Sequence, residues 1–346
     1  MNAKKYTIGV DLGDRRHAVC VLNAQGVMVA EAMIANTREC LTAFGQRYPG
    51  ATIVMETGTH SPWVSRLFEA RAHPVIVANA RKLRAIAASV TKSDEADARM
   101  LARLGRADPA LLSPVKHRGE ATQRALVQLK VRDALVRARV SQMNSARFLV
   151  KSLGVPVPRG VKATAFVRKF REQTDAATAA LVEPLLQVID TLNAQIKQLD
   201  ARLERIAADQ YPQTQRLRQV DGVGPLTALC FVLTVETPER FPATRSVGAY
   251  LGLVPRRDQS GNTDKQLPIT KAGNAQLRCL LVNCAHYILG PFGPPSHLRE
   301  VGERLAARGG KSAKKRAVIA VARKLAVTLL ALWQSGAEYQ PLAHAA

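Results

Sequence analysis

The sequence predicts an α/β domain followed by a mainly α-helical remainder. Short apolar runs alternate with helical segments over residues 1–108, whereas longer helical patterns dominate the rest of the chain. Hydrophobic residues make up 47% of the 346 residues and charged residues 22%, which indicates folded domains rather than disorder. This length favours two or three domains.

The first 108 residues are expected to form a mixed sheet flanked by helices. Apolar runs bounded by turn residues predict strands, and apolar residues three or four positions apart predict helices. We expect strands at 6–11, 17–22, 27–33, 51–56 and 74–78, and helices at 37–47, 61–71, 80–88 and 92–104. This order of elements is that of a ribonuclease-H-like domain.

Residues 109–208 are expected to form a helical coiled-coil region, with a long helix at 120–151 and a break at 154–160. Pro184 predicts that the next regular helix begins near it. A heptad seam follows, with apolar residues alternately three and four positions apart: Val182, Leu185, Ile189, Leu192, Ile196, Leu199, Leu203 and Ile206. The seam could pack against helix 120–151, against a second protomer, or against both, and the pattern favours neither partner.

Residues 209–346 are expected to form a third, mainly helical domain with a helix-hairpin-helix-like turn at 220–225. Gly222 and Gly224 in that turn allow close approach of the backbone, so its N–H groups could bind a phosphate; a plain turn between helices fits equally well. Further helices are expected at 246–253, 273–289 and 311–332, with a polar loop at 255–270.

The charge of the chain predicts a polyanionic partner. Lys and Arg number 50 and Asp and Glu 27, which gives a net charge of +23. The net charge is +5 over residues 1–108, +9 over 109–205 and +9 over 206–346. Nucleic acid is the commonest partner of such surfaces. Aromatic residues are only 5%, which argues against base stacking as the main binding mode.

Neither a membrane span nor a secretory signal is expected. The longest apolar stretch, 317–333, is interrupted by Arg323 and Lys324, and the N-terminus runs straight into a strand pattern. The five cysteines are scattered and include no CxxC pair, which favours reduced thiols over disulfides or a zinc site. These features predict a cytoplasmic protein.

Four carboxylates are placed where a metal site could form. Asp11 ends the first expected strand, Glu56 ends the fourth, and Asp94 and Asp97 lie on one face at the start of a helix. In a ribonuclease-H-like sheet the first and fourth strands are neighbours, and the last helix packs across them. Four such acids would repel one another unless a divalent cation such as Mg²⁺ neutralised them.

The sequence resembles the DEDD-type transposases, or bridge recombinases, of the bacterial insertion sequence IS110 family. The segments that carry the resemblance are IGVDLG with Asp11, VMETGTH with Glu56, KSDEADARMLA with Asp94 and Asp97, LRQVDGVGPLTA, and SVGAYLGLVPRRDQSGNTDKQLPITKAGNAQLRCLLV. The resemblance covers the chain from residue 6 to about residue 287. It implies a RuvC-like domain, a helical coiled-coil linker and a C-terminal transposase domain.

The resemblance also implies a serine nucleophile in the loop after GLVP, which maps to Ser260. Asn262 stands where the family often has a second glycine, and asparagine tolerates the same left-handed backbone. Ser246 is the rival hydroxyl, although its place suits a helix N-cap. Arg256 and Arg257 are candidates to hold the phosphate.

Lys271 is a weaker phosphate-binding candidate. By resemblance, the expected function is RNA-guided DNA recombination through a phosphoserine intermediate, aided by Mg²⁺ or Mn²⁺. The implied partners are donor and target DNA, a structured guide RNA and further copies of the chain, in the bacterial cytoplasm near the nucleoid. The alternatives are a metal-dependent junction endonuclease that uses water, and a nucleic-acid-binding protein without catalytic activity.

Overall fold

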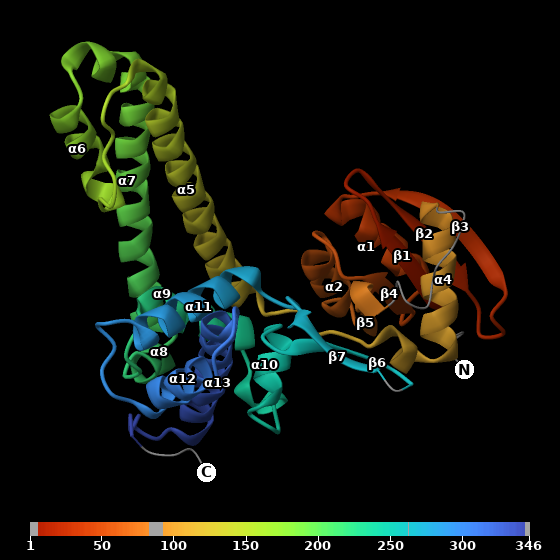
Figure 1. Cartoon of the computed structure of the whole chain (residues 1–346). Coiled ribbons are helices and arrows are strands. Elements are labelled where there is room, and N and C mark those ends of the chain that lie inside the picture. The colour runs from red at the N-terminus through yellow and green to blue at the C-terminus, as the bar shows by residue number, and fades with distance from the viewer. Residues whose placement is uncertain (1–5, 83–92, 262, 343–346) are drawn as a thin grey trace. The chain divides into compact units, whose positions relative to one another are not determined.

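The computed structural model describes residues 6–82, 93–261 and 263–342, which form two compact units (Figure 1). Unit 1 is Met1–Arg118 and unit 2 is Gly119–Ala346. Unit 1 extends ten residues beyond the domain boundary expected at 108. The second expected boundary, at 208, falls inside unit 2 near the end of a long helix.

Unit 1 is built on a five-stranded mixed sheet in the order β3-β2-β1-β4-β5. Its strands are β1 (Thr7–Leu12), β2 (Arg16–Leu22), β3 (Met28–Ala35), β4 (Thr52–Glu56) and β5 (Val75–Ala78). The first three strands are antiparallel, and β4 pairs in parallel with both β1 and β5. All five strands lie within two residues of their predicted positions, and β1 and β4 are neighbours as a ribonuclease-H-like sheet requires.

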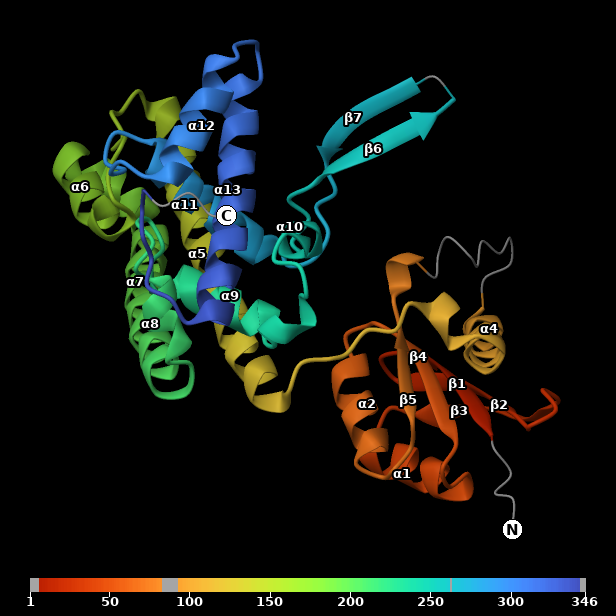
Figure 2. The same ribbon diagram turned by 90° about the horizontal axis from the view of Figure 1, so that it is seen from below.

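Helices cover both faces of this sheet (Figure 2). They are α1 (Arg38–Arg47), α2 (Ser61–Glu69) and α4 (Asp94–Ala107), followed by a short 3₁₀ turn (Pro109–Leu112). Strand residues alternate between the two faces. Ile8 and Val10 therefore pack with α1 and α2, whereas Ala18 and Cys20 pack under α4. The helix expected at 80–88 extends beyond the described residues.

The packing of α4 against the sheet depends on two glycines. A Cβ on Gly9 would collide with the Ala98 carbonyl and the Ala102 amide, so the helix backbone lies directly on β1. Gly105, on α4 itself, meets the side chain of Val54 in β4 in the same way. Side chains at these positions would force the helix away from the strands.

Unit 2 begins with a hairpin of two long helices, α5 (Glu120–Val150) and α7 (Ala176–Gln210). The two helices pack against each other, and the predicted heptad seam of α7 is buried or half-buried within the single chain. Packing of α7 against α5 therefore covers part of the seam within one chain. The short helix α6 (Phe166–Gln173), which the sequence analysis did not predict, packs beside α7.

The expectation that α7 begins near Pro184 was wrong. The helix begins eight residues earlier at Ala176 and runs through the proline. The Asp175 side chain caps its N-terminus by accepting a hydrogen bond from the Thr178 amide at 2.8 Å. Val182 is buried in the cluster around α6, so tertiary packing outweighs the cost of a proline inside the helix.

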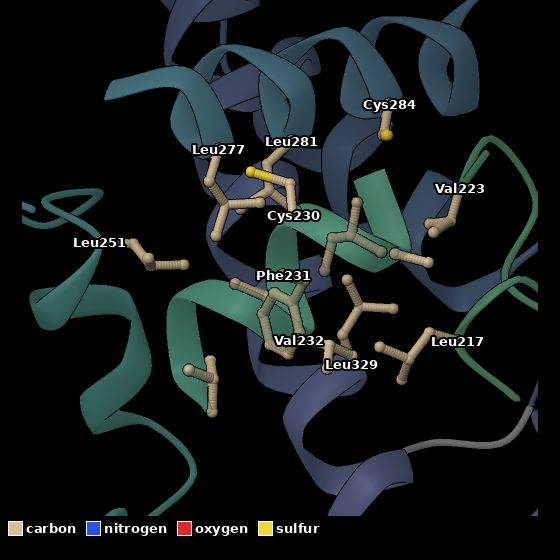
Figure 3. Close-up of a cluster of buried hydrophobic side chains, with 14 of the residues drawn as sticks. Leu217, Val223, Cys230, Phe231, Val232, Leu251, Leu277, Leu281, Cys284 and Leu329 are labelled. Atoms are coloured by element: carbon tan, nitrogen blue, oxygen red, sulfur yellow. The ribbon is translucent and has the colours of Figure 1, made fainter. Parts of the chain in front are cut away.

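The remainder of unit 2 is a helical body around the apolar helix α9, whose side chains point into the core in Figure 3. Phe231 and Leu329 in this core are fully buried. The helices of this body are α8 (Gln213–Leu217), α9 (Pro225–Val235), α10 (Ser246–Tyr250), α11 (Ala275–Leu289), α12 (His297–Ala307) and α13 (Ala313–Ser335). Within the described ranges, α13 alone is long and apolar enough to cross a membrane, and its Leu325 is fully buried in this core.

The segment expected as a polar loop at 255–270 is instead a two-stranded hairpin of β6 (Pro255–Ser260) and β7 (Thr263–Ile269). The loop prediction was wrong because the segment lacks the apolar alternation that marks a strand. Backbone pairing forms the ribbon, and its residues are almost all exposed.

Replacing Gly9 with alanine should destabilise unit 1 by about 2–3 kcal/mol, because the new methyl group would push α4 off β1. Urea unfolding followed by circular dichroism measures this loss. Gly58→Ala is the matched control, since nothing lies within 4 Å of a Cβ at Gly58, and it should change stability by less than about 0.5 kcal/mol. Equal stability of the two variants would contradict the close packing.

His17, in β2, is a fully buried polar residue that should make the stability of unit 1 depend on pH. Its Nε2 atom donates to Asn36 Oδ1 at 3.0 Å, and its Nδ1 atom has no hydrogen-bond partner in the described structure. Burial, and to a smaller extent the nearby His60, lower the pKa of His17, although the Asn36 bond partly opposes this. The folded state therefore favours the neutral ring.

Because the unfolded chain binds this proton more readily, stability should fall as the pH drops below about 6.5, by at most about 1.4 kcal/mol per pH unit for one group. Urea unfolding at pH 7.5 and 5.5 measures the loss. His17→Gln keeps an N–H donor but cannot be protonated, so it should lose less stability on acidification. Burial also lowers the pKa of His117, so the variant should still lose some stability on acidification. An identical loss in wild type and variant would contradict the assignment.

Candidate functional site

Two of the predicted site carboxylates lie at the same end of the sheet in unit 1. The parallel pairing of β1 with β4 ends at Val10 and Met55, and Asp11 and Glu56 are the next residue on each strand. Both side chains are half-buried. The topology of the sheet therefore brings together two acids that are 45 positions apart in the sequence.

Helix α4 brings the other two acids to this end. Its C-terminal part lies at the opposite end of the sheet, where Arg106 donates to the Ala24 carbonyl beyond β2 at 2.9 Å. Its first turn, with Asp94 and Asp97, therefore lies at the end where Asp11 is found. The Ser93 side chain caps the helix by accepting a hydrogen bond from the Ala96 amide at 3.2 Å. Asp94 is therefore not the N-cap residue of α4.

The four carboxylates share one end of the fold but do not converge into a ligand cluster. No group of three or more His, Cys, Asp or Glu residues among those described is arranged to hold a metal ion. The donor set itself fits a hard divalent cation, since all four groups offer carboxylate oxygens. Within the described ranges, no ion pair engages Glu56, Asp94 or Asp97.

Ser260 lies at the tip of the β6–β7 hairpin in unit 2. It is exposed, pairs with Thr263 across the hairpin, and precedes Gly261, whose positive φ of 52° suits the turn. Asn262 lies outside the described residues. The serine belongs to unit 2 and the four acids to unit 1, so the two halves of the predicted site are built on separate units.

The basic candidates around Ser260 differ in their surroundings. Arg257 forms a two-pronged ion pair with Asp264, with N–O distances of 2.7 and 2.6 Å, and this pairing lowers the pKa of Asp264. Arg257 is thus engaged within the hairpin. Arg256 is exposed, and Lys271 is exposed with a left-handed backbone at φ 55° just before α11.

The expectation that Ser246 caps a helix was wrong. Ser246 is the first residue of α10, and its hydroxyl donates to the Ala243 carbonyl at 2.6 Å. This hydrogen bond gives the rival serine a local structural role in the turn that leads into α10.

The two glycines of the turn between α8 and α9 differ in the space beside them: Gly222 is crowded and Gly224 is not. Gly222 has φ 85°, and a Cβ there would lie 2.8 Å from the Tyr287 ring. Gly224 immediately precedes α9, and nothing lies within 4 Å of a Cβ at that position. The open side of the turn leaves room for a ligand beside the backbone at Gly224.

A polar cluster that the sequence patterns did not predict lies beside Asp11 and Glu56. Asp14, Asn36, His60 and Trp63 form side-chain hydrogen bonds between loops at the acid end of the sheet. The signal that could have revealed the cluster is weak, since it consists of single polar residues just after β1, β3 and β4.

Comparisons with known proteins identify the family. A DEDD transposase model of the IS110 group matches residues 8–154, and the model described as "Transposase IS116/IS110/IS902 family" matches residues 214–297. The chain is 26% identical over 292 residues to the transposase for insertion sequence element IS1111A of Coxiella burnetii, covering 82% of this chain and 77% of that protein.

Two further relatives align over similar lengths. The transposase for insertion sequence element IS1328 of Yersinia enterocolitica is 27% identical over 281 residues, covering 80% of this chain and 82% of the relative. The pilin gene-inverting protein of Moraxella bovis is 26% identical over 278 residues, covering 79% of this chain and 76% of the relative. With two family models matched in chain order, these alignments show that the chain belongs to the IS110 family of transposases, enzymes of DNA transposition and recombination.

Proposed function

We propose that this transposase is an RNA-guided DNA recombinase that cleaves and rejoins strands through a phosphoserine link at Ser260. In this proposal Asp11, Glu56, Asp94 and Asp97 hold Mg²⁺ or Mn²⁺. The observation that carries the proposal is the position of the four acids: two follow the paired ends of parallel neighbouring strands, and two lie in the first turn of the helix across them.

In the proposed reaction, the Ser260 Oγ atom attacks a DNA phosphorus. The Oγ–P bond forms as the bond from phosphorus to the 3′ oxygen breaks. The hydroxyl proton passes to solvent, to which the hairpin tip is exposed, and the departing 3′ oxygen takes a proton from water. A divalent cation held by the four carboxylates would supply positive charge at the phosphate. The serine ester conserves the bond energy, so rejoining requires no high-energy cofactor.

Several basic and backbone groups are proposed to bind the nucleic acids. The exposed Arg256 and Lys271 would contact phosphates near Ser260, and the open turn at Gly224 would offer backbone N–H groups. We propose a guide RNA as the partner of residues 109–205, whose net charge of +9 suits a phosphate backbone. Base pairing would then choose the DNA sequence.

The separate placement of Ser260 and the acids supports an active site shared between protomers. Each group is built on its own compact unit of the chain. The α5–α7 hairpin also leaves large apolar side chains uncovered, with Phe148 72% and Leu181 70% exposed. We therefore propose a homo-oligomer in which the serine of one protomer acts beside the acids of another.

Removing Ser260 should abolish strand cleavage, and removing any one of the four acids should slow it strongly. Purified protein would be incubated with Mg²⁺, labelled donor and target DNA, and candidate RNA, and covalent adducts resolved on a denaturing gel. Ser260→Ala should form no adduct. Asp11→Asn, Glu56→Gln, Asp94→Asn and Asp97→Asn should each lower the cleavage rate ~10²-fold or more. Omitting the RNA should remove sequence-directed cutting.

Two matched variants serve as controls in this assay. Ser246→Ala removes the rival hydroxyl and should keep the adduct. Glu95→Gln removes an acid from the same helical turn but a different face, and should leave cleavage unchanged. Cutting by Ser260→Ala without an adduct would instead support a junction endonuclease that uses water. Wild-type binding in every acid variant, with no cleavage by any protein, would support a non-catalytic nucleic-acid binder.

Mixing two inactive variants should restore cleavage if the active site is shared between protomers. Ser260→Ala supplies intact acids and Asp11→Ala supplies an intact serine, so mixed oligomers contain one complete site. In the mixture, DNA should become covalently attached only to the Asp11→Ala polypeptide, because that polypeptide carries the intact serine. A size tag on one variant identifies which polypeptide carries the DNA. An adduct-free mixture, with mixed oligomers demonstrated by co-purification, would contradict sharing in trans.

A further inference from the structure

The two acids on β1 and β4 lie just beyond the point where these strands stop pairing. The β1–β4 ladder ends at Val10 and Met55, whereas Asp11 pairs onward with Ala18 of β2 and Glu56 with Ala78 of β5. The backbone ladder between β1 and β4 therefore does not extend to the acids. Contacts between the chain segments that follow the two acids can therefore contribute to their spacing.

Three chain segments meet at this end of the sheet because of the strand directions. The β1–β2 turn contains Gly13 and Asp14, β3 is followed by Asn36, and β4 is followed by the loop that leads to His60. Since β2 is antiparallel to both β1 and β3, the turn after β1 and the end of β3 share the end of the sheet where β4 stops.

Asn36 ties the end of β3 to the turn after Asp11. Its Nδ2 atom donates to the Asp14 carbonyl at 2.9 Å and to the Gly13 carbonyl at 3.4 Å. Its Oδ1 atom accepts from Nε2 of the buried His17 at 3.0 Å. Because the Gly13 and Asp14 carbonyls can only accept, the NH₂ group must face the turn, and the amide oxygen is left to accept from His17.

His60 joins the same turn to the loop after Glu56. Its Nε2 atom donates to Asp14 Oδ1 at 3.0 Å, and its Nδ1 atom accepts from Trp63 Nε1 at 3.2 Å. The indole can only donate, so it selects the tautomer that carries a proton on Nε2. Asn36 and His60 both donate to Asp14, which places the two residues in one network.

We propose that Asn36 and His60 are positioning residues that hold the chain after Asp11 against the chain after Glu56 and so set the spacing of these two acids. This inference rests on the proposed role of the acids as metal ligands. Asp14 is three residues beyond Asp11, and His60 is four residues beyond Glu56. The hydrogen bond between their side chains therefore crosses the gap where the β1–β4 ladder has ended.

Loss of this network should weaken metal binding without unfolding the protein. Groups that hydrogen-bond directly to a metal ligand typically contribute 10–100-fold in affinity, and a network one step further from the ligands should contribute at the lower end of that range. In the full-length protein, Asn36→Ala and His60→Ala should bind Mn²⁺ about tenfold more weakly, measured from the electron paramagnetic resonance signal of free Mn²⁺. They should also need about tenfold more metal for half-maximal cleavage, with rates near wild type at saturating metal.

Three further variants separate positioning from general stability. His60→Gln retains an N–H group that can donate to Asp14 and should restore most of the affinity. Trp63→Phe keeps an aromatic ring and removes only the donor to His60, so it tests the network if Asn36→Ala fails to fold. Asn23→Ala is the control: its side chain accepts from the Gln25 and Val27 amides at 3.0 and 2.9 Å in the β2–β3 turn, at the far end of the sheet. It should leave the Mn²⁺ affinity unchanged.

Parallel measurements on Asp11→Asn and Glu56→Gln test the metal-ligand assignment separately from the positioning role of Asn36 and His60. If Asp11→Asn loses Mn²⁺ binding while folded Asn36→Ala, His60→Ala and Trp63→Phe bind as wild type, the positioning role is wrong and the metal site stands. If Asp11→Asn and Glu56→Gln both bind Mn²⁺ as wild type, the ligand assignment fails and the positioning role fails with it. A loss of affinity in Asn23→Ala equal to that in His60→Ala would also overturn the inference.

Discussion

The close contact between α4 and β1 is the constraint on which the acidic end of unit 1 depends. Only glycine at position 9 allows the helix backbone to lie on the strand, and Gly105 repeats this arrangement against Val54. Because helix and strand run in opposite directions, the same contact places Asp94 and Asp97 at the end where β1 delivers Asp11. The close packing of a helix backbone on a strand thus determines where these four acidic side chains lie.

Sequence reasoning succeeded where local patterns are strong. The apolar runs of β1 and β4 have clear signals, and the order of elements was enough to make β1 and β4 neighbours. The position of four acids at one end of the sheet follows from that topology. How closely their oxygens approach does not follow, because it depends on side-chain packing and on the ends of strand ladders, which are properties of the folded chain.

The remaining differences show tertiary contacts outweighing local signals. The ribbon of β6 and β7 has no apolar face, so its backbone pairing left no periodic trace in the sequence. The start of α7 was misplaced because the Asp175 cap and the burial of Val182 outweigh the effect of Pro184. Likewise, the pairing of Arg257 with Asp264 depends on the register of the hairpin, which sequence spacing alone did not reveal.

Ion pairing in unit 1 bears on how the proposed metal ligands are neutralised. With 50 basic against 27 acidic side chains, a carboxylate in this chain is surrounded by an excess of possible partners. Glu31 pairs with Arg99, within the same sheet and helix that carry the site, yet no ion pair in the described structure engages Glu56 or Asp97. An internal arginine would neutralise these groups and compete with any cation from solution. Carboxylates that no internal cation neutralises would be available to a metal ion that can bridge protein and phosphate.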